Sequence, residues 1–220
     1  MRGQLLAIIL HFYFMSAMMS EKMAGSGKEW QAKSLMTACS DQYPDCPTIS
    51  TSEIIVLLRD RNSHKNHDKH ADKSNHVESS VVSDNSVILV DVRSAVERKL
   101  SMIPGAITAE EFETMFKKDL KSYQSRLIIP YCTIGFRSGK YGTNLKKSYG
   151  FTNVRNGEGI ILWTHSSTSH LVTKVGGVEV KTTDVHTFGS AWDLAADHYD
   201  TVQFGTFLFL MHGVTALFRH

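Results

Sequence analysis

The chain has few cysteines and prolines and no strong excess of charge. Its 220 residues include three cysteines and four prolines, and the formal net charge is +2. Three cysteines are too few for a disulfide scaffold, and without a Cys-x-x-Cys pair they indicate neither a zinc site nor a dithiol redox centre. A charge this small, with no basic stripe, gives no reason to expect nucleic-acid binding. The sequence therefore predicts an ordinary globular protein that uses no metal and no cofactor.

No apolar run is long enough for a standard transmembrane helix. The run from Leu5 to Met19 follows Arg2 and falls short of the roughly 20 residues that a spanning helix needs. A basic start and a short apolar core are typical of a signal peptide, although no clean cleavage motif follows. Residues 1–24 are thus expected to be a signal peptide or an uncleaved membrane anchor. This predicts a secretory or membrane-associated location, with a cytoplasmic or organellar location as the alternative.

A second apolar run, Phe204 to Phe218, makes the end of the chain unusual. It is expected to be either a terminal helix packed on the domain or a segment in contact with a membrane. We therefore treat residues 166–220 as a C-terminal extension with an apolar tail. Cys39 and Cys46 could form a disulfide in an oxidising compartment, and the sequence leaves that open.

Strand and helix patterns alternate through residues 47–165. Continuous apolar runs at 87–90 and 127–131 predict strands that are buried on both faces. The capping boxes at Ser50 and Thr108 predict two helix starts, the second ahead of the apolar residues Phe112, Met115 and Phe116. A further helix is expected to end at Gly150. The alternation implies an α/β fold, a parallel sheet with helices on both faces.

A polar segment interrupts this pattern. Residues 61–86 are rich in Lys, Asn, Asp, Ser and His and have almost no apolar side chain before Val81. Such a segment buries too little surface to offset its ordering entropy, so it is predicted to be a low-complexity surface insertion without a helix. Its histidines, which include His64 and His67, are therefore not expected to align as metal ligands.

Cys132 stands between a predicted buried strand and a predicted helix. It opens the segment Cys132-Thr133-Ile134-Gly135-Phe136-Arg137-Ser138. Backbone N–H groups of such a loop and the dipole of the following helix converge on the sulfur and favour the thiolate, which is the reactive form. Open α/β sheets also place their sites at the carboxyl ends of strands. Cys132 is therefore predicted to be a nucleophile rather than an inert core thiol.

These motifs resemble the rhodanese family of sulfane-sulfur transferases. The matching segments, in the order the family has them, are Asp91-Val92-Arg93 with Glu97, Ile103-Pro104-Gly105-Ala106, Tyr131 to Ser138, and Gly150-Phe151 through Val154 to Trp163. The resemblance implies a single-domain sulfurtransferase with a rhodanese-like parallel sheet covered by helices on both faces. One departure is Gly157-Glu158-Gly159, where the family has a tighter Gly-Gly pair.

The resemblance also implies a mechanism and a set of site residues. The Cys132 thiolate would attack the sulfane sulfur of thiosulfate or a persulfide, and a nucleophilic acceptor would then remove it. Donor and acceptor would be small molecules or protein thiols and persulfides. The terminal sulfur would be held by backbone N–H groups of the substrate-binding loop, Thr133, Ile134, Gly135, Phe136, Arg137 and Ser138.

Individual side chains of the site are assigned as follows. Arg137 is expected either to bind an anionic donor or to brace the loop through carbonyl groups. Ser138 is expected to cap the following helix. Asp91 and Arg93 are expected to form a structural ion pair at the strand end rather than to take part in catalysis.

Two alternatives to sulfur transfer remain. Related phosphatases and arsenate reductases have a loop longer by one residue, whereas four residues separate Cys132 from Arg137. The shorter ring of N–H groups suits a persulfide sulfur better than a phosphate. A non-catalytic rhodanese-type interaction module is the other alternative, and it usually lacks the cysteine that this chain has.

Overall fold

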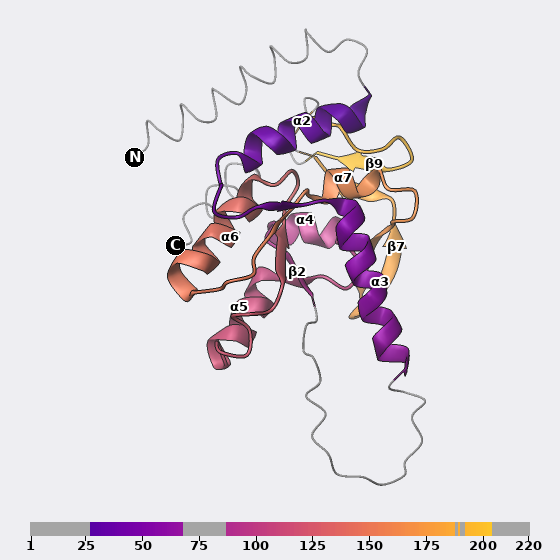
Figure 1. Ribbon diagram of the computed structural model, residues 1–220. Helices are drawn as coiled ribbons and strands as arrows, with labels where there is room; N and C mark the ends of the chain where they lie inside the picture. Colours follow the sequence, from indigo (N-terminus) through magenta and orange to yellow (C-terminus); the bar gives the residue numbers. More distant parts are fainter. Residues whose placement is uncertain (1–26, 68–86, 188, 190–191, 204–220) are drawn as a thin grey trace.

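The computed structural model describes residues 27–67, 87–187, 189 and 192–203, with the backbone alone for 61–67 (Figure 1). The predictions for residues 1–24, for most of the polar insertion and for Phe204 to Phe218 lie outside these ranges. No helix in the described ranges has the length and apolar character needed to cross a membrane.

Parallel strands form the centre of the molecule. β2 (Ile88–Asp91) lies between β3 (Ile107–Thr108) and β4 (Ile128–Tyr131), and both pairings are parallel. Next to them, β5 (Asn156–Gly157) pairs in parallel with β1 (Thr48–Ile49). The predicted parallel sheet is confirmed, because both apolar runs of the sequence became neighbouring central strands.

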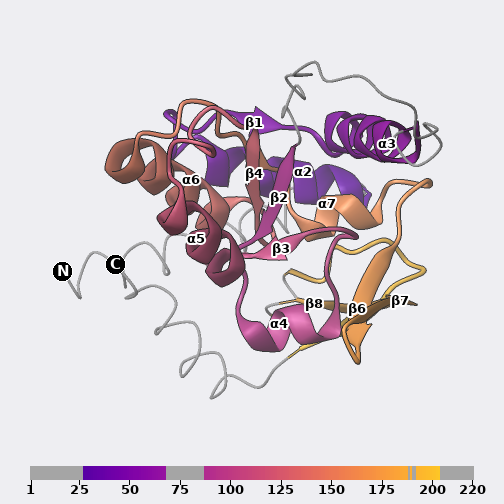
Figure 2. The same cartoon turned by 90° about the horizontal axis from the view of Figure 1, so that it is seen from below.

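Helices cover both faces of these strands. In Figure 2, α5 (Ala109–Lys118) and α6 (Phe136–Tyr149) lie on one side of β2 and β4. The other side is covered by α2 (Lys28–Ser40), α3 (Thr51–His67) and α7 (Ile160–Thr164). The short helix α4 (Ala95–Leu100) lies below the sheet in this view, beside the C-terminal strands. The α/β class with helices on both faces is therefore confirmed.

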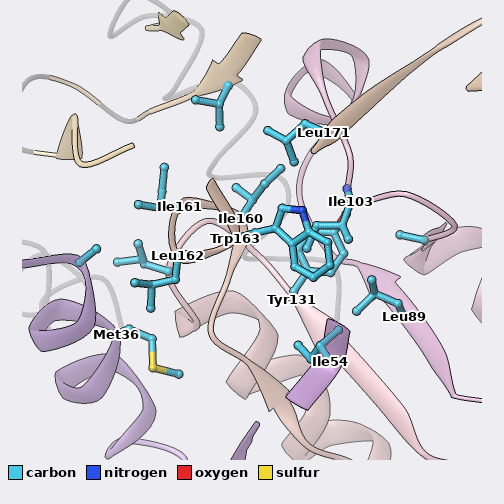
Figure 3. Close-up of a cluster of buried hydrophobic side chains, with 14 of the residues drawn as sticks. Met36, Ile54, Leu89, Ile103, Tyr131, Ile160, Ile161, Leu162, Trp163 and Leu171 are labelled. Carbon is cyan, nitrogen blue, oxygen red and sulfur yellow. The ribbon is translucent and has the colours of Figure 1, made fainter. Parts of the chain in front are cut away.

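The alternation of side chains along the strands creates one apolar cluster per face. Leu89 and Ile129 point into the cluster beneath α2, α3 and α7, which we call the α2-side cluster. Val90 and Ile128, the neighbouring residues, point into the cluster beneath α5 and α6, the α5-side cluster. Figure 3 shows the α2-side cluster, in which Met36, Ile54, Leu89, Ile103, Tyr131, Ile160, Ile161, Leu162, Trp163 and Leu171 are labelled.

The predicted helix signals are present in the structure. Ser50 and Glu53 exchange the two capping-box hydrogen bonds at the start of α3. Thr108 and Glu111 do the same for α5, in which Phe112 and Phe116 are buried. Met115 was expected on this buried face but is 38% exposed, because its position on the helix turns it away from the α5-side cluster. Gly150 ends α6 with φ 70°.

The prediction of no helix in the polar insertion is wrong for its first residues. The backbone of α3 continues through residues 61–67 and ends at His67. A helix that is already nucleated gains one hydrogen bond for each residue it adds, and this stretch contains no proline or glycine to stop it. The polar residues 61–67 are therefore helical because they continue a helix whose first turns are already stabilised by packing.

The C-terminal extension packs against the domain through its own strands. β6 (Leu171–Val175) and β7 (Val178–Thr182) form an antiparallel hairpin, and β8 (Asp184–His186) pairs in parallel with β9 (Asp200–Val202). Leu171 and Val185 enter the α2-side cluster, and β8 packs against α4. The extension thereby brings its residues close to the sheet end that carries the cysteine loop.

Cys39 and Cys46 are free thiols, so the disulfide that the sequence left open is not formed in the structure. Cys39 belongs to the α2-side cluster and Cys46 to the α5-side cluster. Burial raises the pKa of Cys39 to about 12 and that of Cys46 to about 11. Both thiols therefore remain protonated near neutral pH and behave as small apolar side chains.

Candidate active site

Cys132 directly follows β4, and its side chain is almost completely buried, at 2% exposure. The loop from Thr133 to Gly135 then leads into α6, which begins at Phe136. The predicted strand–loop–helix arrangement is therefore present. It places the sulfur at the carboxyl end of a central parallel strand and beside the first turn of a helix.

Two donors point at the sulfur. The backbone N–H of Gly135 donates to Cys132 Sγ at 3.2 Å, and the Ser138 hydroxyl lies 3.5 Å from the same atom. Gly135 adopts φ 91°, a conformation that favours glycine, and it is the residue before the first turn of α6. The expected Ser138 cap is wrong for this reason. Because the glycine starts the helix early, Ser138 lies inside the first turn and its hydroxyl turns to the sulfur.

The loop backbone is held from behind by α7. The N–H of Ile160 donates to the Cys132 carbonyl at 2.9 Å, and the N–H of Ile161 donates to the Thr133 carbonyl at 3.3 Å. Gly159, just before this helix, has φ 101°, and a Cβ at that position would lie 2.5 Å from the Thr133 carbonyl oxygen. Glycine at 159 is thus what allows α7 to approach the cysteine loop so closely.

A second brace comes from β5. The buried Asn156 donates from Nδ2 to the Gly135 carbonyl at 2.9 Å. This hydrogen bond fixes the peptide group between Gly135 and Phe136. Gly135 is the residue whose N–H donates to the sulfur. Ile134, between these contacts, directs its side chain into the α2-side cluster and not toward the sulfur.

Arg137 is tied to a buried carboxylate. Its two terminal nitrogens donate to Glu97 at 2.8 and 2.7 Å, and one of them also donates to the Thr133 hydroxyl at 3.1 Å. Burial by itself would raise the pKa of Glu97, but the charge and hydrogen bonds of Arg137, with His186 and Arg93, hold it well below its ordinary value. Arg137 was expected either to bind an anionic donor or to brace the loop through carbonyl groups. The structure shows it bracing the loop, but through a carboxylate and a hydroxyl instead of carbonyls.

Asp91 and Arg93 form the expected ion pair. Arg93 donates to Asp91 at 2.7 Å, and neither side chain is exposed to solvent. The Tyr131 hydroxyl donates to the same carboxylate at 2.6 Å, and Arg93 also donates to the Ser101 carbonyl at 2.6 Å. These groups are buried and bond mainly to one another, although Arg93 Nη1 is buried without a hydrogen-bond partner among the described residues. The pair therefore joins the ends of β2 and β4, and we assign it a structural role.

Comparison with known proteins identifies this arrangement. The sequence model of the rhodanese-like domain family matches residues 74–161, which include β2, the cysteine loop and the start of α7. The chain carries a rhodanese-like domain. No curated protein matches the chain.

Two of the solved structures to which the chain is similar are bacterial proteins. The BH2092 protein of Bacillus halodurans has a TM-score of 0.37 and 16% identity, over 60% of this chain and 79% of that one. Protein RPA3614 of Rhodopseudomonas palustris CGA009, described as of unknown function and a possible tyrosine phosphatase, has a TM-score of 0.36 and 22% identity, over 56% of this chain and 83% of that one.

Part of the site lies before the segment that matches the rhodanese-like domain. In α2, Met36 faces the loop, and a Cβ on Gly135 would lie 3.4 Å from its terminal methyl group. Just after α2, the ring of Tyr43 packs edge-on against Phe136 with centroids 5.5 Å apart. Helix α2 and the segment after it therefore pack against the cysteine loop and the first residue of α6. Phe136 itself is partly buried against the α2-side cluster.

Three polar side chains of the site did not stand out in the sequence. Glu97 was recognised only as part of a family motif, and His186 only within the stretch Val185-His186-Thr187, to which the family resemblance extends weakly and without a role for the histidine. Asn156 was not recognised at all. Glu97 could have been found from its capping box, since Ser94 at the start of α4 pairs with it. Asn156 and His186 carry no local signal, because each reaches the rhodanese-like domain's loop only through the tertiary fold. Among the described residues, no group of three or more His, Cys, Asp or Glu side chains could hold a metal ion.

Proposed function

We propose that the rhodanese-like domain is a sulfurtransferase that uses Cys132 as its nucleophile. The observation that carries this proposal is the donation of the Gly135 N–H to Cys132 Sγ, within a loop that has only four residues between Cys132 and Arg137. A donor fixed on the sulfur stabilises negative charge there. The same charge develops on the outer sulfur of a persulfide.

The reaction has two balanced steps. In the first, the Cys132 thiolate attacks the outer sulfur of thiosulfate, a sulfur–sulfur bond forms to Cys132, and the bond to the sulfonate group breaks to release sulfite. In the second, a nucleophile such as cyanide attacks the outer sulfur of the persulfide and leaves as thiocyanate. The Cys132 thiolate is thereby restored, and covalent storage of the sulfur gives ping-pong kinetics.

The surroundings of the sulfur favour a small guest over a phosphate ester. Cys132 is 2% exposed, and Met36 and Tyr43 pack over the loop that holds it. The charge of Arg137 is also largely neutralised by its two hydrogen bonds to Glu97. A phosphoryl dianion needs strong positive charge and several hydrogen-bond donors. The outer sulfur of a persulfide is a single atom and needs few hydrogen-bond donors.

The decisive assay compares thiosulfate:cyanide sulfur transfer with hydrolysis of an aryl phosphate. We expect the wild-type protein to form thiocyanate and to release no phosphate. Cys132→Ser should abolish transfer, and Cys46→Ser, which removes a buried thiol remote from the loop, should retain it if the protein folds. Phosphate release that depends on Cys132 would instead establish a phosphatase. Activity in neither assay would indicate a non-catalytic interaction module.

A further inference from the structure

His186 lies beside the carboxylate that holds Arg137, although it comes from outside the segment that matches the family. Its Nδ1 atom is 3.4 Å from Glu97 Oε1, and the two side chains are 4% and 3% exposed. β8 carries this histidine and packs against α4, which carries Glu97. At 3.4 Å the contact is longer than a good hydrogen bond, so its strength depends mainly on the charge of the imidazole.

Glu97 Oε1 is shared by three groups. It accepts from Arg137 at 2.7 Å and lies 3.4 Å from the Thr133 hydroxyl, in addition to its contact with His186. With a neutral imidazole, the charges of Glu97 and Arg137 sum to zero. With a protonated imidazole, the same cluster carries one net positive charge in a nearly dry environment.

Other charges near His186 are compensated or exposed. Arg93 is paired with Asp91 at 2.7 Å, and Arg98 of α4 is paired with Glu110 at 3.0 Å. The remaining charged groups on α4, β8 and β9 are Lys99, which is exposed, Asp184, which is half-buried, and Asp200, which accepts from the Thr183 hydroxyl at 2.8 Å. Of these charged groups, Glu97 is the one that lies within ion-pair distance of His186, at 3.4 Å.

We infer that His186 is a positioning residue that sets the charge of the donor site: once protonated, it shares Glu97 with Arg137 and leaves more of the Arg137 charge to attract an anionic sulfur donor. The Arg137 side chain is 19% exposed, lies in the first turn of α6 and donates to the hydroxyl of Thr133, the residue after Cys132. A net positive charge on this side chain would therefore act on a donor bound at the sulfur. For turnover the inference rests on the proposed function; for anion binding it does not.

Two donors of matched shape isolate this effect. Methanethiosulfonate differs from thiosulfate by a methyl group in place of one charged oxygen, and both donors would leave a persulfide on Cys132. The ratio of their kcat/KM values therefore cancels the titration of Cys132 itself. In the wild-type protein we expect the ratio of the kcat/KM for thiosulfate to that for methanethiosulfonate to rise roughly fivefold as the pH is lowered from about 8 to about 5.5.

His186→Gln should remove this rise, and His186→Asn serves as the second variant if the first does not fold. His170→Gln is the matched control, because His170 is an exposed histidine of the same extension and should leave the rise unchanged. A wild-type ratio that stays constant with pH would overturn the inference, as would the same rise in both His186 variants.

A binding measurement separates this inference from the proposed function. Cys132→Ser cannot turn over, so its affinity for thiosulfate can be measured by calorimetry at the same two pH values, with and without His186→Gln. One outcome is that the wild-type protein transfers no sulfur while Cys132→Ser binds thiosulfate more tightly at the lower pH only when His186 is present. In that case the inference stands and the proposed function fails. Equal affinities at both pH values overturn the inference, whatever the transfer assay shows.

Discussion

Replacing Glu97 with Gln tests whether a buried ion pair holds the cysteine loop. The amide keeps the size of the side chain, and its oxygen can still accept the capping hydrogen bonds from Ser94. The losses are therefore the negative charge and the hydrogen bond that Arg137 donates to Oε1. Arg137, which is 19% exposed, then loses the carboxylate of Glu97. Removing one partner of a buried pair costs about 3–5 kcal/mol, and because Arg137 keeps some contact with water we expect about 3 kcal/mol.

Glu111→Gln is a matched control for this substitution. Glu111 occupies the same capping-box position in α5, but its side chain is exposed. The control should lose no more than about 0.5 kcal/mol. Urea unfolding near neutral pH, followed by circular dichroism, measures both changes. For a chain of this size, Glu97→Gln should also lower Tm by roughly 6–12 °C.

The result that would refute the reasoning is a loss for Glu97→Gln as small as that for Glu111→Gln. The outcome should also be nearly independent of salt, because charges buried to this degree are poorly screened. A destabilisation that disappears in concentrated salt would show that the Glu97–Arg137 pair behaves as a surface pair.

Three further predictions concern the same region. Gly159→Ala should lower the free energy of unfolding by at least about 3 kcal/mol and should lower kcat/KM, because its Cβ would meet the Thr133 carbonyl. Gly176→Ala is the control: Gly176 has φ 58° and open space around it, so this variant should lose only about 1 kcal/mol. Equal losses for the two variants in urea unfolding would contradict the close approach of Gly159 to the loop. Arg93→Met should cost about 3–5 kcal/mol, since it leaves Asp91 buried without its cation; a loss under about 1 kcal/mol by the same method would contradict this. The pKa of Glu97 is held below its ordinary 4.5 in the folded state, so the ionised carboxylate contributes its full stabilisation above pH 4.5 and loses it as the pH falls further. The wild-type protein should therefore lose more stability than Glu97→Gln between neutral pH and about pH 3. Equal losses for the two proteins in urea unfolding would contradict this prediction.

The elements with a local signal could be predicted from the sequence. The runs of β2 and β4, the capping boxes of α3 and α5 and the glycine stop of α6 depend on residues a few positions apart. The ion pair of Asp91 and Arg93 was predictable for the same reason, since the two residues are separated by one position at a strand end. The strand–loop–helix setting of Cys132 follows from its immediate neighbours.

Contacts between distant segments could not be predicted in this way. Arg137 and Glu97 are 40 residues apart, and their hydrogen bonds depend on where β2 and β4 lie in the sheet. His186 reaches Glu97 only because β8 packs against α4. Ser138 was misassigned for a local reason: Gly135, with its positive φ, is the residue that precedes α6, so the helix starts three residues earlier than a cap at Ser138 would require. Ser138 then lies in the first turn and donates to the sulfur.

The measurement that tests the sulfurtransferase account most directly is the mass of the intact protein after treatment with thiosulfate. The account predicts an added mass of about 32 Da, one sulfur atom, which peptide mapping places on Cys132 and which cyanide removes. Cys132→Ser should gain no such mass. An unmodified wild-type protein, or an adduct that persists in Cys132→Ser, would contradict the account.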